Sequence, residues 1–114
     1  MAPLTRASVA LITASSAGLG AATARLFASH GVRVIVNYHS SYDKAQDLVV
    51  ELGDLARKTL SSNEETEGVT AIKADMSKKD EVERLVKESM EKWGRLDVGV
   101  FISQNPRFLD RFVF

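Results

Sequence analysis

The chain has 114 residues, enough for one domain with a modest core. Its 15 Lys and Arg residues balance 15 Asp and Glu residues, and this zero net charge argues against nucleic acid as a partner. The chain has no cysteine, which excludes disulfides and thiolate metal sites. We expect a cytoplasmic protein that does not bind membranes, because no apolar run is long enough to span a bilayer and residues 1–6 do not resemble a secretion signal.

Short apolar runs alternate with segments of helical periodicity. The first expected strand, residues 8–13, has no charged residue, as in a strand that is buried on both faces of a parallel sheet. A helix is expected over residues 18–30, with Gly31 at the position of a left-handed cap. The later expected strands are residues 32–37, 69–74 and 96–102.

Two further helices separate these strands. Capping boxes are predicted where they begin, at Ser40 with Asp43 and at Ser77 with Asp80. The second helix has apolar residues at helical spacing, namely Ala45, Leu48, Val49, Leu52, Leu55 and Ala56. In the third helix one buried face is expected to contain Val82, Leu85, Val86, Met90 and Trp93. The alternation predicts an α/β fold with right-handed crossovers.

A glycine-containing turn stands between the first expected strand and the first expected helix, where residues 13–20 read TASSAGLG. Small residues let the backbone approach a ligand closely, and the free N–H groups and positive dipole of a helix N-terminus suit a pyrophosphate. A dinucleotide site requires this placement inside a strand–helix–strand unit. The glycines would equally permit a tight turn without a ligand, so the turn alone leaves both interpretations open.

Several stretches together resemble the short-chain dehydrogenase/reductase family of the classical type, in its N-terminal cofactor-binding half. The turn is similar to the family's Thr-Gly-x-x-x-Gly-x-Gly, with Ala14 in place of the first glycine, and the other stretches read VRVIVNYHSS, IKADMSKKDEVERLVKE and GRLDV. The resemblance covers residues 6–98. It implies a Rossmann-like, doubly wound parallel sheet, truncated to four strands in the order 3-2-1-4, with ligand at the carboxyl ends of the strands.

The resemblance also implies which residues bind the cofactor. They lie in the glycine turn, after the second strand and after the third strand, and they are Thr13, Ser15, Ser16, Gly18, Leu19, Gly20, Asn37, Tyr38, His39, Ser40, Asp75 and Met76. Asp75 matches the family acid that contacts the adenine ring, although it could also be a plain loop acid. The first glycine's replacement by Ala14 is expected to weaken binding without abolishing it.

The end of the second strand favours NADP over NAD. An acid there would bind both ribose hydroxyls of NAD and repel the extra phosphate of NADP, but this stretch has none. Hydroxyls, the His39 imidazole and the nearby helix start could instead accept the 2′-phosphate. Ala17 stands where NADP-preferring members often have a basic residue, and His39 could also be a solvated loop histidine.

The family pattern breaks after the fourth strand. Phe101-Ile102-Ser103-Gln104 replaces the family's Asn-Asn-Ala-Gly, and four of the five phenylalanines lie in residues 101–114. We therefore divide the chain into a partial dinucleotide-binding domain, residues 1–100, and an atypical tail, residues 101–114. An apolar tail of this kind favours association.

No catalytic residue is assigned. The family uses a Ser and a Tyr-x-x-x-Lys pair, whereas Tyr38 and Tyr42 are followed four residues later by Tyr42 and Gln46. The two histidines, His30 and His39, do not form a metal-binding pattern either.

Three hypotheses follow. The first hypothesis is a truncated or mis-spliced, inactive product of an oxidoreductase gene whose full enzyme would transfer hydride between NADP(H) and a carbonyl or alcohol. The chain could instead be a module that binds nucleotide without turnover, which nucleotide-induced stabilisation would support. The third hypothesis is an interaction protein that self-associates through the exposed fourth strand and the apolar tail.

Overall fold

The computed structural model describes residues 8–13, 18–60 and 68–102. Within these ranges, strands and helices alternate as predicted. In chain order they are β1 (Val9–Ile12), α1 (Gly18–Ser29), β2 (Arg33–Tyr38), α2 (Tyr42–Leu60), β3 (Val69–Lys73), α3 (Lys79–Trp93) and β4 (Val98–Val100). None of these helices is both long enough and apolar enough to cross a bilayer.

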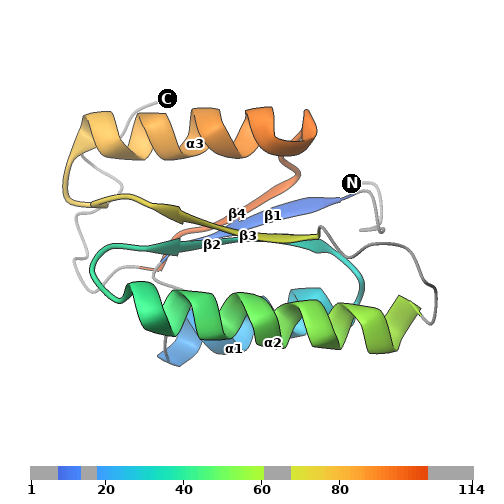
Figure 1. Cartoon of the computed structure of the whole chain (residues 1–114). Coiled ribbons are helices and arrows are strands. Elements are labelled where there is room, and N and C mark those ends of the chain that lie inside the picture. Colours follow the sequence, from blue (N-terminus) through green and yellow to red (C-terminus); the bar gives the residue numbers. More distant parts are fainter. Residues whose placement is uncertain (1–7, 14–17, 61–67, 103–114) are drawn as a thin grey trace.

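The strands form one parallel sheet in the order β3-β2-β1-β4, which confirms the predicted fold class. Helix α3 covers one face of the sheet, and α1 and α2 lie side by side on the other (Figure 1). The central strand β1 aligns its last residue, Ile12, with Val36 of β2 and Val100 of β4. The carboxyl ends of all four strands therefore meet at one edge of the sheet.

Both faces of β1 are buried, as its uncharged apolar run predicted, and residues 34–37 of β2 are buried as well. Successive side chains of a strand point to opposite faces of the sheet, so each strand contributes residues to two hydrophobic clusters, one on each face. The cluster under α1 and α2 includes Ile12, Val34, Val36, Ala24 and Leu48. The cluster under α3 includes Val9, Leu11, Ile35 and Leu85.

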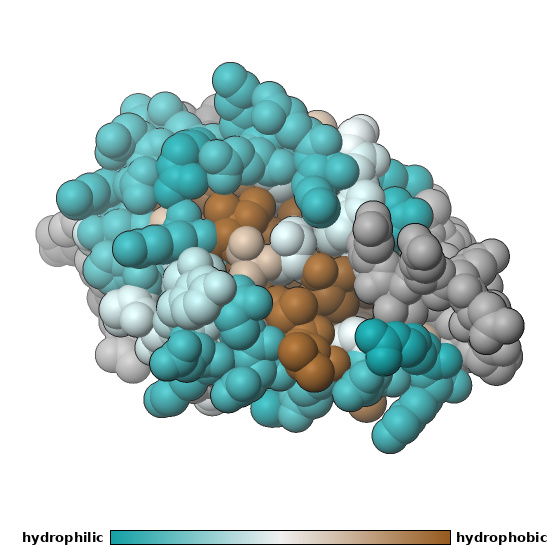
Figure 2. All heavy atoms as spheres, in the orientation of Figure 1, coloured by the Kyte–Doolittle hydropathy of each residue, from teal (hydrophilic) through white to brown (hydrophobic). Residues whose placement is uncertain are grey.

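The outer strand β3 is less covered than the two strands inside the sheet. Residues 69–72 are half-buried, and Lys73 is exposed. Figure 2, in the same orientation as Figure 1, shows apolar surface between the hydrophilic surfaces of α3 and α2.

The predicted caps are partly confirmed. Gly31 and Gly94 have φ of +80° and +73°, the left-handed conformation expected of glycines that end helices. Both predicted capping boxes are wrong. Helix α2 begins at Tyr42, and Ala45 N–H donates to the Ser41 carbonyl, so Ser41 rather than Ser40 precedes the helix. Lys78 precedes α3 and makes no side-chain cap.

The predicted face of α3 needs one correction. Val82 and Leu85 are buried and Val86 and Trp93 are partly buried, but Met90 is 45% exposed. Ser89 occupies the buried position instead, and its hydroxyl donates to the Leu85 carbonyl at 2.7 Å.

Candidate functional site

The candidate site lies at the carboxyl edge of the sheet. In open α/β sheets, ligands bind outside the carboxyl ends of the strands, near the point where the strand order reverses. Here that point lies between β1 and β4, because the chain leaves β1 toward β2 on one side and later returns to β4 on the other (Figure 1).

Thr13 ties the end of β1 to the segment that follows β4. Its side chain is buried, and its hydroxyl oxygen accepts a hydrogen bond from Ile102 N–H at 2.8 Å. Its own backbone N–H donates to the Val100 carbonyl at 3.0 Å. Thr13 thus holds two neighbouring strand ends together at the start of the glycine turn.

The described part of the glycine turn has the conformation that close approach to a ligand requires. Gly18 opens α1 with φ of +60°, and a Cβ built there would meet nothing within 4 Å. Gly20 is buried, and Leu19 is 70% exposed. The first turn of α1 contains no acidic residue that would oppose an anion. Ser15 and Ser16 lie outside the described residues.

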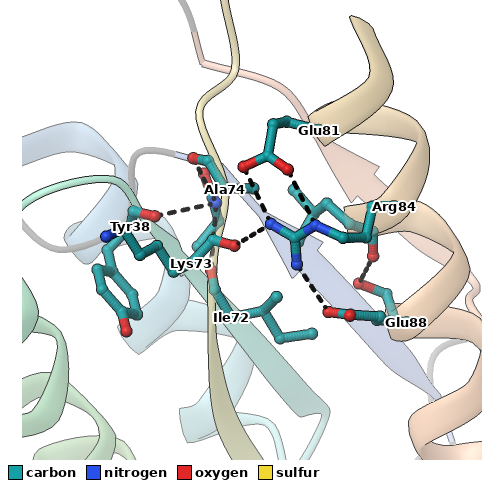
Figure 3. Close-up of polar contacts among 10 residues, drawn as sticks. Tyr38, Ile72, Lys73, Ala74, Glu81, Arg84 and Glu88 are labelled. Atoms are coloured by element: carbon teal, nitrogen blue, oxygen red, sulfur yellow. Dashed lines mark hydrogen bonds and ion pairs between the residues drawn. The ribbon is translucent and has the colours of Figure 1, made fainter. Parts of the chain in front are cut away.

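The residues at the end of β2 have different surroundings. Asn37 is buried, and its amide Nδ2 donates to the Ile72 carbonyl at 3.3 Å, which joins β2 to β3. The Tyr38 ring meets the Tyr42 ring edge-on, with 5.9 Å between centroids. The Tyr38 carbonyl accepts from Ala74 N–H at 2.9 Å (Figure 3). Ser40 is exposed just beyond His39.

Asp75 stands beside His39 at this edge. Its carboxylate Oδ2 lies 3.7 Å from His39 Nε2. The other oxygen, Oδ1, accepts from the Ser77 hydroxyl at 2.6 Å and from Ser77 N–H at 2.9 Å. These two hydrogen bonds, with the nearby positive charges of His39 and Lys78, hold the pKa of Asp75 below its usual value.

Of the predicted residues, the structure brings His39 and Asp75 together and leaves Met76 apart from them. Met76 is partly buried and packs against the cluster under α3 that includes Leu85. Its side chain therefore contributes to the packing of α3 on the sheet.

The sequence reasoning missed Arg84. Its guanidinium Nη2 donates to the Lys73 carbonyl at 2.7 Å, and Glu81 and Glu88 flank it on α3 (Figure 3). The hydrogen bonds that Arg84 donates to Glu81, followed by the charges of both carboxylates, raise the pKa of Arg84. Arg84 thereby fixes the end of β3 just before Asp75. The available signal was the spacing of the two glutamates, three residues before and four after the arginine.

The described residues contain no group of three or more His, Asp and Glu side chains that could hold a metal ion. Both tyrosines lie at the β2–α2 connection, and neither is followed by Lys four residues later. The N-terminus of α1, which opens with the left-handed Gly18 and has no acidic residue in its first turn, is a place that suits an anion.

Comparison with known proteins gives a consistent result. A model of the short chain dehydrogenase family matches residues 8–101. A short-chain dehydrogenase/reductase of Pestalotiopsis microspora is 41% identical over 90 residues, which cover 79% of this chain and 30% of that protein. A 3-oxoacyl-[acyl-carrier-protein] reductase of Synechocystis is 37% identical over 92 residues, which cover 81% of this chain and 33% of the relative.

Solved structures agree with this result. A short chain dehydrogenase of Burkholderia cenocepacia, in complex with NADP, aligns with a TM-score of 0.66 and 30% identity, over 82% of this chain and 34% of that one. A dehydrogenase/reductase of Sinorhizobium meliloti aligns with a TM-score of 0.69 and 28% identity, over 84% of this chain and 34% of that one. The chain thus spans about a third of the length of these relatives.

Proposed function

Because this chain belongs to the short-chain dehydrogenase/reductase family, we propose that its sheet edge binds the adenosine diphosphate half of a nicotinamide dinucleotide, with NADP preferred to NAD. One observation carries the proposal: a left-handed Gly18 with open space around it begins α1 directly beyond the carboxyl end of β1. The N–H groups of the first turn of α1 would hold the pyrophosphate. A bound dinucleotide supplies the hydride chemistry of the family.

The preference for NADP rests on the end of β2. No acid stands at residues 37–41 to bind both ribose hydroxyls, and the exposed His39 and Ser40 offer hydrogen-bond donors to a phosphate instead. Ala17 adds no positive charge, so His39 would carry most of the preference. The NADP complex of the Burkholderia cenocepacia relative supports a cofactor of this class.

We further propose that these 114 residues bind nucleotide without turning it over. Hydride transfer in the family needs a proton donor beside the carbonyl, and neither Tyr38 nor Tyr42 has a lysine partner four residues later. Residues 1–100 would form the nucleotide-binding unit, and residues 101–114 would form a tail distinct from it. Hydride transfer between NADP(H) and a carbonyl or alcohol is proposed only for a protein in which this unit is joined to a catalytic half.

Isothermal titration of the purified chain with NADP, NAD and 2′,5′-ADP tests binding, and consumption of NADPH with a panel of ketones tests turnover. We expect binding of NADP and 2′,5′-ADP, weaker binding of NAD, and no turnover. A chain that binds none of the three would refute the proposed site, and steady NADPH consumption would refute the lack of turnover.

A second candidate function follows from the β4 edge. Among the described residues β4 pairs only with β1, and its residues carry no charge that would block the addition of another strand. An open hollow of about 360 Å³ lies beside it, lined by Val86, Leu96, Asp97, Val98, Gly99 and Phe101. Sedimentation at increasing protein concentration tests self-association. A mass that stays monomeric throughout would exclude it.

A further inference from the structure

The end of β3 has no neighbouring strand on its outer side within the described part of the chain, where β3 pairs with β2 alone. Ala74 N–H donates to the Tyr38 carbonyl at 2.9 Å, and the Ala74 carbonyl accepts from Asn37 Nδ2 at 3.5 Å. The peptide group is planar and trans, so the Lys73 carbonyl and the Asp75 N–H point the opposite way, toward the open edge of the sheet. Both groups need partners there.

Two side chains of α3 supply these partners. Arg84 Nη2 donates to the Lys73 carbonyl at 2.7 Å, and the Asp75 N–H donates to the Glu81 carboxylate. Arg84 and Glu81 also bond to each other, with distances of 3.0 and 3.1 Å (Figure 3). A parallel strand would offer the same pattern, an N–H to one carbonyl and a carbonyl to the N–H two residues later. The Glu81–Arg84 pair therefore takes the place of a strand.

The effect of this pair is local. Glu81 and Arg84 are three residues apart on α3, and Glu88 accepts from Arg84 Nη1 at 3.1 Å. The planar guanidinium donates in several directions at once, so one arginine can hold two carboxylates and a backbone carbonyl. Their side chains are 30–44% exposed, and ion pairs this accessible contribute little to overall stability. What the pair determines is where residues 73–75 lie.

We propose that Glu81 and Arg84 are positioning residues for the base of the bound nucleotide: by holding the end of β3 from its outer side, they fix the place from which the Asp75 carboxylate accepts a hydrogen bond from a purine amino group. This inference rests on the proposed function. It adds two residues of α3 that control how the base is read without contacting it.

The position of Asp75 suits this role. A pyrophosphate at the start of α1 would lie beyond β1, and β3 is two strands away, or about 10 Å across the sheet, which an adenosine can reach from its 5′-phosphate. Ser77 holds Oδ1 of Asp75 by two hydrogen bonds, so Oδ2 is the oxygen on the side of β2, where it faces His39. An ionised carboxylate only accepts hydrogen bonds, so it favours an amino group over a carbonyl oxygen.

Two probes that differ at one position of the base test the proposal, namely NADP and its deaminated analogue, in which hypoxanthine places a carbonyl oxygen where adenine has the amino group. Titration calorimetry of the full chain gives the ratio of their dissociation constants. We expect the wild-type chain to prefer NADP by about tenfold, and Arg84→Gln and Glu81→Ala each to lower this preference by about fivefold. Asp75→Asn should lower it as much, because an amide can pair with either group.

Arg57→Gln is the matched control. Arg57 also bonds a carboxylate three residues before it, Asp54 at 2.9 Å, but it lies near the far end of α2. This variant should keep the wild-type preference for NADP. The double variant Asp75→Asn/Arg84→Gln should have the same preference as Asp75→Asn alone, because Arg84 acts through Asp75. Thermal melts of the variants confirm that each is folded.

The outcomes separate this inference from the proposed function. If the wild-type chain binds neither nucleotide, the proposed function fails and the inference fails with it. If both nucleotides bind equally well to the wild-type chain, Asp75 does not read the base and the inference is overturned while the site stands. Arg84→Gln that weakens both nucleotides equally, or keeps the wild-type ratio, would overturn the positioning role. A further fall in the ratio when Arg84→Gln is added to Asp75→Asn would overturn it as well.

Discussion

The Ile102 N–H donates to the Thr13 hydroxyl at 2.8 Å, across 89 residues of sequence. The bond is made by the side chain of the residue that directly follows β1, whose backbone N–H donates to the Val100 carbonyl. The same threonine precedes the glycine turn. The geometry of the turn and the path of the chain beyond β4 are thereby linked through one hydroxyl group.

Replacing Thr13 by Val should lower the free energy of unfolding by about 1–3 kcal/mol, because Ile102 N–H would lose its partner in a partly buried place. Urea unfolding followed by circular dichroism measures the change. Thr13→Ser keeps the hydroxyl and should cost less. If the valine variant is as stable as the serine variant, the hydrogen bond contributes little.

Substitution of Gly18 by Ala should weaken nucleotide binding as well as stability. An L-residue at φ of +60° costs about 1–2 kcal/mol, and its methyl group would point into the open space where a ligand would approach. Gly94→Ala is a matched control, since Gly94 has φ of +73°, equally open surroundings and a position at the end of α3. Both variants should lose similar stability, and only Gly18→Ala should lose affinity for 2′,5′-ADP by calorimetry. Equal affinity in the two variants would argue against a ligand at this turn.

The two apolar residues Leu85 and Met90 of α3 should respond differently to truncation. Leu85→Ala removes a fully buried side chain and should cost about 2–5 kcal/mol. Met90→Ala removes a side chain that is 45% exposed and should change stability by about 0.5 kcal/mol or less. Chemical denaturation measures both. Comparable losses would mean that Met90 belongs to the buried face after all.

The free energy of unfolding should depend on pH through Asp97. The Arg95 guanidinium, and then Val9 N–H, bond to its carboxylate and hold the pKa of Asp97 below its ordinary value of 3.8. Because the folded state has the lower pKa, the stabilisation is present above about pH 4 and is lost as the pH falls through the folded value.

Urea unfolding of the wild-type chain and of Asp97→Asn, at several pH values below about pH 5, measures this effect. The variant should be less stable near neutral pH and should lose less stability on acidification. Asp47→Asn, on the outer side of α2, is the control and should follow the wild-type profile. An unchanged profile in Asp97→Asn would contradict the expectation.

The strands and the glycine turn were predictable because their signals are local. Uncharged runs such as residues 9–12 must be buried on both faces, and glycines after helices mark left-handed caps. The strand order came from family resemblance combined with the rules of doubly wound sheets. The fourth strand was predicted too long, since apolar character continues to Ile102 while the pairing ends at Val100.

Other features depend on contacts that a local pattern cannot specify. Ser77 has the spacing of a capping box, but its hydroxyl bonds back to Asp75 and Lys78 precedes the helix. Met90 lies one residue, about 100° around the helix, from the buried Ser89, and so falls outside the covered face. The pairing of His39 with Asp75 needs the β2–β3 register, which places the ends of two separate strands together.

The order of the strands has a consequence for how the chain folds. The central strand β1 is made first, yet the carboxylate that bonds to Val9 N–H belongs to Asp97, 88 residues later. On the ribosome, β1 can pair with β2 early, but its other edge stays open until β4 has emerged. Contacts of such long sequence separation slow folding and leave an unpaired edge exposed in the meantime. The pairing of the second edge of β1 therefore waits for β4, and nascent chains that stop short of β4 are the ones we expect chaperones to hold.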